Sequence, residues 1–224
     1  MRIDVRGVII PNDYKLVYDW WGWESTCPKD VFDALDKAKG AAVKVYISSG
    51  GGSYYAGLDI YTALKHYQGD VKICITSHAH SAAGIIACAA ESEIMPGAMF
   101  MTHRIANGNR GNCEEQRHNA DVLEAHDESV CGLYMAKTGR SREEVLGMMR
   151  KETYLHAEKA VEMGFVDKIA EDTVQFVAST VPLLTGDQVQ KIMETIRAEQ
   201  SGEPDTRLLF ANAKLQLLKL GGSK

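Results

Sequence analysis

Residue types suited to acyl transfer occur at three separate points of the chain: Ser81, His103 and the glycines Gly50–Gly52. A serine hydroxyl becomes a nucleophile when an imidazole accepts its proton, and backbone N–H groups at a glycine-rich turn can stabilise the resulting oxyanion. Each point also has a simpler explanation. Ser81 could be a helix N-cap, the glycines a tight turn, and His103 a structural or surface histidine. Taken singly, none of them decides between the two interpretations.

Ser81 lies where a predicted strand passes into a predicted helix. Val71–Ile75 is short, apolar and β-branched, whereas Ser81–Ala90 is rich in alanine, and the change in character falls near residues 77–80. A serine in the first turn of a helix has unpaired backbone N–H groups beside it and the positive end of the helix dipole beneath it. That position suits a nucleophile next to an oxyanion donor, and it equally suits a cap.

The glycines and the histidine also follow predicted strands. Gly50–Gly52 comes after the buried strand Val43–Ile47, and His103 comes directly after Met99–Thr102. No Lys-Ser/Thr follows the glycines, as a phosphate loop would require, and their spacing does not fit a dinucleotide fingerprint. A peptide-binding or oxyanion role, or a plain turn, remains. Because sites gather at the carboxyl ends of parallel strands, we expect these residues and Ser81 to converge.

Strands and helices alternate along the chain, which predicts an α/β fold with crossover connections. Further predicted elements are a strand over Arg2–Ile10, a helix from Pro28 closed by Gly40, a strand over Glu93–Met95, a long helix over Cys113–Lys137, a capping-box helix from Ser141, and a last helix that stops at Gly164. The polar face of the long helix, with His118, Asp121, His126, Asp127 and Glu128, is predicted to be solvated and not to bind metal. The aromatic cluster Leu16–Trp23 should either pack under the first helix or form a subunit contact.

Composition excludes several classes of protein. The chain has 224 residues, a formal net charge of -5 and no basic run, which argues against nucleic acid as a partner. Its five scattered cysteines are typical of reduced thiols in a cytosolic compartment. The N-terminus does not have the pattern of a secretion signal, and no apolar run approaches about 18 residues. We therefore expect a soluble, cytoplasmic protein with no metal or organic cofactor.

Four stretches in order, I-S-S-G-G-G-S-Y-Y-A-G, A-H-S-A-A-G, M-F-M-T-H and Y-L-H-A-E-K-A-V-E-M-G-F-V-D, resemble the motifs of the ClpP serine peptidases. The likeness is strongest to the ClpP-related head-maturation proteases of phages and prophages, and it spans residues 2–169. It implies a ClpP/crotonase-like α/β fold of repeated strand–helix units with a protruding handle helix. On this basis residues 1–170 form the peptidase core and residues 171–224 a C-terminal extension.

The resemblance also assigns roles to individual residues. It makes Ser81 the nucleophile and His103 the base, with Glu152 orienting the imidazole. The Gly51–Gly52 turn supplies one oxyanion N–H and Ala82 supplies the other.

Some positions leave alternatives open within this resemblance. Asp167 is the less favoured substitute for the third catalytic residue. His80, where the family has a small residue, could crowd the nucleophile or point away from it. Gly50 replaces a proline of the family and makes the peptide-binding turn more flexible.

The same resemblance implies protein or peptide substrates, a heptameric or double-heptameric ring, and either a Clp-type ATPase or phage capsid and scaffold proteins as partners. Two other functions stay open: a crotonase-fold enzyme acting on acyl-thioesters, and an inactive structural subunit. In the C-terminal extension we expect helices over Leu184–Ala198 and Leu208–Leu220, separated by a polar linker at 200–206. This extension could dock on the protein shell, contact a capsid component or be trimmed.

Overall fold

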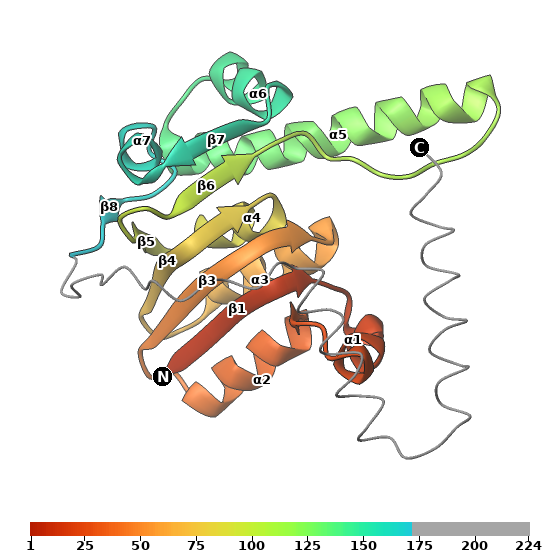
Figure 1. Cartoon of the computed structure of the whole chain (residues 1–224). Coiled ribbons are helices and arrows are strands. Elements are labelled where there is room, and N and C mark those ends of the chain that lie inside the picture. Colours follow the sequence, from red (N-terminus) through yellow and green to blue (C-terminus); the bar gives the residue numbers. More distant parts are fainter. Residues whose placement is uncertain (172–224) are drawn as a thin grey trace, which may run out of the picture. The chain divides into compact units, whose positions relative to one another are not determined.

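A computed structural model describes residues 1–171, and the predicted C-terminal helices and linker lie outside these residues. The described chain forms an eight-stranded sheet covered by helices (Figure 1). Its strands are β1 (Arg2–Ile9), β2 (Ser25–Thr26), β3 (Val43–Gly52), β4 (Val71–His80), β5 (Glu91–Ile94), β6 (Met99–Thr102), β7 (Thr153–His156) and β8 (Lys168–Ile169). The order β2-β1-β3-β4-β5-β8 is parallel throughout, and β6 pairs with both β4 and β7. This sheet confirms the predicted α/β class.

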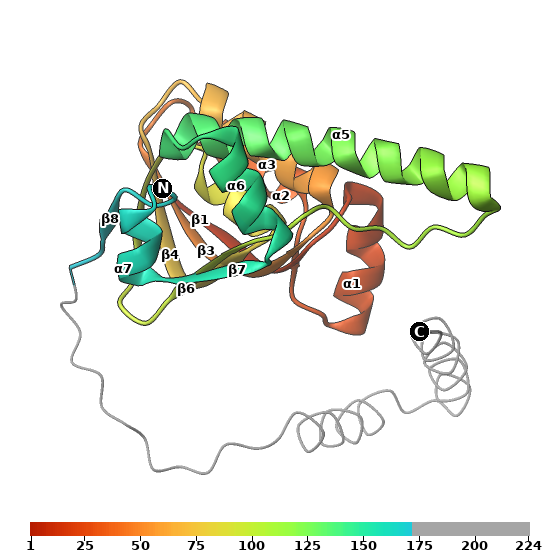
Figure 2. The same ribbon diagram turned by 90° about the horizontal axis from the view of Figure 1, so that it is seen from above.

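The helices are α1 (Lys15–Trp21), preceded by a single 3-10 turn at Asn12–Tyr14, then α2 (Pro28–Ala38), α3 (Tyr54–His66), α4 (Ala82–Ala87), α5 (Cys113–Thr138), α6 (Arg142–Arg150) and α7 (Ala157–Glu162). Helix α4 packs on β3 and β4, α3 packs on α4, and α2 packs on α3. Helix α5 is the predicted long helix. Its N-terminal half extends well beyond the sheet (Figure 2).

Strand β4 has two different neighbours along its length, and this arrangement positions the site. Its first half pairs with β5, from Lys72 to Ile75. Its second half pairs with β6, where His80 lies opposite Met101. Ser81, directly after β4, and Thr102, the last residue of β6, therefore lie side by side, and His103 follows where β6 ends. The prediction that this strand ends at Ile75 was wrong, because β4 runs to His80. Residues 76–78 are polar and do not show an apolar strand pattern, although this second half of β4 lies beside β6.

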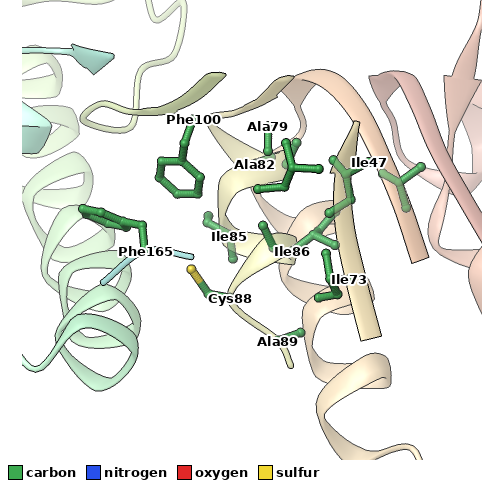
Figure 3. Packing of buried hydrophobic residues seen from close by; sticks show 14 of the residues in the cluster. Ile47, Ile73, Ala79, Ala82, Ile85, Ile86, Cys88, Ala89, Phe100 and Phe165 are labelled. Carbon is green, nitrogen blue, oxygen red and sulfur yellow. The ribbon is translucent and has the colours of Figure 1, made fainter. Parts of the chain in front are cut away.

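The core is built around the short helix α4, all of whose residues are buried. Ile85 and Ile86 lie between Phe100 and Phe165 on one side and the strand residue Ile73 on the other (Figure 3). An apolar helix enclosed on all sides cannot shift without opening cavities, and a large-to-small substitution here costs about 2–5 kcal/mol. The residue at its N-terminus, Ser81, is held with the same rigidity.

Two surface predictions have different outcomes. Helix α1 is not packed under α2: Leu16 is 80% exposed and Trp20 is 56% exposed, so the aromatic cluster remains a surface feature of the described chain. Asp127 was predicted to be solvated on α5, and this was wrong, because it is only 2% exposed. It shares a helix face with the buried residues Val130, Cys131 and Tyr134, at spacings of three, four and seven residues.

Candidate active site

Ser81 links β4 to α4 with no intervening loop. Its backbone has φ 55° and ψ -122°, a conformation that L-residues with a side chain rarely adopt. Such strain costs about 1–3 kcal/mol and persists only where the surrounding structure enforces it. Here the Ser81 N–H donates to the Met101 carbonyl at 3.0 Å, and its own carbonyl accepts from Gly84 at 2.9 Å. The side chain makes no helix-capping hydrogen bond, so it is free for another partner.

That partner is His103. Its Nε2 atom lies 2.7 Å from Ser81 Oγ, the two side chains coming from adjacent strand ends. If the hydroxyl donates this hydrogen bond, the imidazole is neutral and carries its proton on Nδ1. The contact joins two residues that the sequence singled out separately, and it is the geometry a general base needs to activate a hydroxyl.

The glycines continue strand β3 to its end and do not form a separate turn, which corrects the sequence-based expectation. Gly51 and Gly52 have φ values of 95° and 148°, and they pair with Val8 and Ile9 of β1. The Gly51 N–H donates to Ser49 Oγ at 3.1 Å, and Ser53 N–H donates to the Ile9 carbonyl at 2.8 Å.

A cavity of about 190 Å³ lies beside the serine, and both Gly52 and Ala82 line it. Its walls also include the side chains of Ile85 and Ile105. The Gly51 backbone lies close to the Ser81–Ala82 junction: a Cβ on Gly51 would lie 2.8 Å from the Ser81 Cβ and 3.1 Å from the Ala82 nitrogen. The site therefore combines a hydroxyl–imidazole pair, closely approaching backbone and a recess lined by both polar and apolar residues.

Glu152 lies beside the histidine, but its carboxylate has another partner. Strands β6 and β7 are antiparallel with Thr102 opposite Thr153, so Glu152 precedes β7 at the point where His103 leaves β6. The Tyr154 hydroxyl donates to Glu152 Oε1 at 3.1 Å. Among residues 1–171, no hydrogen bond joins Glu152 to His103. Glu152, the third residue of the predicted triad, therefore lies opposite His103 across the strand pair, but its side chain does not complete a triad.

His80 and Asp167 lie apart from the Ser81–His103 contact. The His80 ring packs edge-on against Tyr154 at 5.5 Å and lies 5.0 Å from the His78 ring, so it points away and leaves the contact formed. Burial, with His78 nearby, lowers its pKa below the ordinary value. Asp167 accepts hydrogen bonds from Ser92 N–H at 2.7 Å and from Lys137 Nζ at 2.5 Å. These contacts give Asp167 a structural role away from His103.

The cysteines offer no competing nucleophile near the site. All five are free, and four of them are buried. Burial raises the pKa of Cys88, at the C-terminal end of α4, to about 12, so it stays a thiol at neutral pH. Among residues 1–171, no group of three or more His, Cys, Asp or Glu side chains is arranged to hold a metal ion. No helix in this part of the chain combines the length and apolar character needed to cross a membrane.

Comparison with known proteins identifies the family. The model of the Clp protease family matches residues 31–173, which is more than half of the chain. The chain belongs to the Clp protease family. Among solved structures, a point mutant of ClpP1 from Listeria monocytogenes is similar, with a TM-score of 0.63 and 23% sequence identity over 77% of this chain and 92% of that one. This match shows the ClpP fold, and together with the family it supports a ClpP-like serine peptidase.

Two residues of this Clp family site were missed by sequence reasoning. Tyr154 was not recognised as a partner of Glu152, and no sequence signal could have shown it, because the hydrogen bond depends on side-chain rotamers. Asp127 was placed on a solvated face of α5. Its spacing from Val130, Cys131 and Tyr134 was the signal that could have identified it as buried.

Proposed function

We propose that this protein is a serine endopeptidase that uses Ser81 as nucleophile and His103 as general base. The observation that carries the proposal is the 2.7 Å contact between Ser81 Oγ and His103 Nε2, made at a serine in a strained backbone conformation. His103 takes the hydroxyl proton as Ser81 attacks a peptide carbonyl, and then returns it to the leaving amine. Water next hydrolyses the acyl-enzyme by the same base catalysis.

Backbone donors on the two sides of the cavity stabilise the oxyanion in this proposal. Gly52 ends β3, Ala82 follows the nucleophile, and both residues line the cavity. The Gly51 N–H donates to Ser49, and Gly51 contributes through the close approach of its backbone to Ser81. Loss of one oxyanion donor typically costs 10²–10³ in rate. An extended peptide would pair with the backbone near residues 51–54.

Glu152 completes the triad in this account. Its position opposite the start of the His103 segment supports this role, and its side chain must leave Tyr154 to reach Nδ1 of the imidazole. Because the Tyr154 bond holds Glu152 away, it also supports a second candidate function: a structural subunit that keeps the fold and is inactive until rearranged. A crotonase-type acyl-thioester enzyme would not need Ser81, His103 and Glu152 together.

We assign the substrate class from the resemblance of residues 2–169 to the head-maturation proteases of phages and prophages, a resemblance that includes Glu152-Thr153-Tyr154. The protein processes capsid or scaffold proteins during head maturation, acting without a cofactor in the cytoplasm of the host. Partnership with a Clp-type ATPase is the alternative. A heptameric or double-heptameric ring accounts for the exposed apolar side chains of α1 and for the projecting half of α5.

Cleavage of an unfolded protein substrate tests the proposal. Wild-type protein should degrade casein to peptides without ATP, and Ser81→Ala and His103→Ala should each lower the rate by at least 10³-fold while keeping the same oligomeric state. Equal cleavage by wild type and Ser81→Ala would reveal a contaminating protease and refute the assignment. Absence of cleavage by all three, in a correctly assembled oligomer, would favour the inactive subunit.

A further inference from the structure

The segment that carries His103 has no regular structure after β6, yet it is fixed at specific backbone atoms. Residues 103–112 form neither helix nor strand. Before the histidine, the Met101 carbonyl accepts from Ser81 N–H. After it, Arg104 N–H donates to the Met149 carbonyl at 3.1 Å, and Ile105 N–H donates to Asp127 Oδ1 at 2.7 Å. The position of the imidazole therefore depends on what holds residues 104 and 105.

Asp127 has an unusual environment for a carboxylate. Its side chain is 3% exposed, and it accepts from the Arg104 guanidinium Nε as well as from the Ile105 backbone. Removing a carboxylate from water costs several kcal/mol unless charge and hydrogen bonds compensate, and an apolar residue of similar volume often serves stability as well. Both compensating donors come from the two residues directly after His103. The buried Asp127 carboxylate therefore restrains the two residues that directly follow His103, the proposed base.

The location of Asp127 on α5 makes it a firm anchor. No residue of α5 before it is buried, and the half of the helix that precedes it projects away from the sheet (Figures 1 and 2). Val130, Cys131 and Tyr134 on the following turns are packed in the core. Asp127 therefore lies where the helix first meets the core. Its carboxylate connects this packed part of α5 to the His103 segment through the hydrogen bonds from Arg104 and Ile105.

We infer that Asp127 is a positioning residue for catalysis: by binding Arg104 and Ile105 it holds the His103 imidazole within reach of Ser81. It touches neither the serine nor the imidazole, and it also fixes Ile105, which lines the cavity. A misplacement of about 1 Å in a catalytic group can cost 10²-fold in rate. This inference rests on the proposed function, because it assumes that Ser81 and His103 react together.

The test measures the rate and the extent of Ser81 modification by a fluorophosphonate probe on the full-length protein. Asp127→Ala removes both contacts, and Asp127→Asn keeps an oxygen for Ile105 N–H while losing the charge that binds Arg104. Glu124→Gln is the matched control, because Glu124 is on the same helix, faces the same guanidinium at 3.8 Å and is 70% exposed. Hydrogen exchange at the Ile105 amide reports the anchor independently of activity.

We expect every Ser81 site of Asp127→Ala to be labelled, but about 100-fold more slowly, with the probe's apparent binding constant unchanged. Asp127→Asn should be intermediate, Glu124→Gln within twofold of wild type, and the Ile105 amide should exchange faster in Asp127→Ala. Labelling of a smaller fraction of sites at the wild-type rate would mean that Asp127 serves folding alone, and it would overturn the inference. So would equal rates for both Asp127 variants and the control. If wild-type Ser81 were unreactive, the proposed function itself would fail.

Discussion

Replacement of Gly51 by alanine should remove most of the reactivity of Ser81, whereas the same change one residue earlier should not. Gly51 has φ 95°, and its added Cβ would lie 2.7 Å from the His80 carbonyl oxygen and 2.8 Å from the Ser81 Cβ. Real Cβ atoms essentially never approach so closely, so either the β3 end or the Ser81 junction must move. Gly50→Ala is a matched control, because a Cβ there would meet nothing within 4 Å.

The magnitude follows from two effects. A residue with a side chain at such a positive φ costs about 1–3 kcal/mol of folding free energy. If the β3 end moves away from Ser81 to relieve the contact, the neighbouring Gly52 moves away from the cavity that it lines. Loss of the oxyanion donor proposed at Gly52 would cost about 10²–10³ in rate. Gly51→Ala should therefore be less stable and much less reactive, and Gly50→Ala should change reactivity by no more than about twofold.

The assay is the second-order rate constant for fluorophosphonate labelling of Ser81, with thermal unfolding measured in parallel to confirm that each variant is folded. Labelling of folded Gly51→Ala within threefold of wild type would contradict this role of Gly51. An equal loss of reactivity in Gly50→Ala and Gly51→Ala would contradict it as well, because the effect would then reflect general flexibility of the strand end and not the close approach to Ser81.

Three further predictions concern other side chains. Tyr154→Phe removes the hydrogen bond that holds Glu152 away from His103. Because an exposed hydrogen bond of this kind is worth about 1 kcal/mol, the rate of Ser81 labelling should rise by up to about fivefold. A decrease in that rate would contradict the role proposed for Glu152. Burial alone would raise the pKa of Asp167, but Lys137 beside it lowers the pKa below its ordinary value, so the stability it adds is present at neutral pH and is lost as pH falls below about 3.8. Asp167→Asn should therefore lower the free energy of unfolding in urea by about 1 kcal/mol at pH 7 and should leave Ser81 labelling unchanged. The difference in unfolding free energy between the variant and wild type should shrink as the pH falls below 3.8. Burial lowers the pKa of His80 below 6.5, so the unfolded chain takes up the proton first, and the stability of wild type should fall as the pH drops below about 6.5. In urea unfolding at pH 7.5 and 5.5, His80→Asn should lose less unfolding free energy between the two pH values than wild type does. An equal loss in both proteins would show that other groups cause it.

The elements with strong local signals could be predicted from the sequence. Strand β6 is observed at Met99–Thr102 as predicted, and the capping box at Ser141 is confirmed by its hydrogen bonds with Glu144. Helix α5 differs from its prediction by one residue at its C-terminal end. In each case the signal lies in neighbouring residues, because caps and helical periodicity are local properties.

The parts that failed depend on contacts between distant segments. The second half of β4 becomes a strand by pairing with β6, and the polar residues 76–78 give no local sign of this. Asp127 is buried because the His103 segment supplies a guanidinium and a backbone N–H to it, and only the fold brings these groups together. The convergence of Ser81 and His103 was expected from their places at strand ends, and the structure places them in hydrogen-bond contact.

Mapping the fluorophosphonate adduct on the assembled wild-type protein by peptide mass spectrometry tests directly whether Ser81 is activated by His103. We expect one adduct per chain, located on Ser81, absent in Ser81→Ala and formed far more slowly in His103→Ala. An unmodified Ser81 in a correctly assembled oligomer, or an adduct formed equally fast without His103, would contradict an activated Ser81–His103 pair.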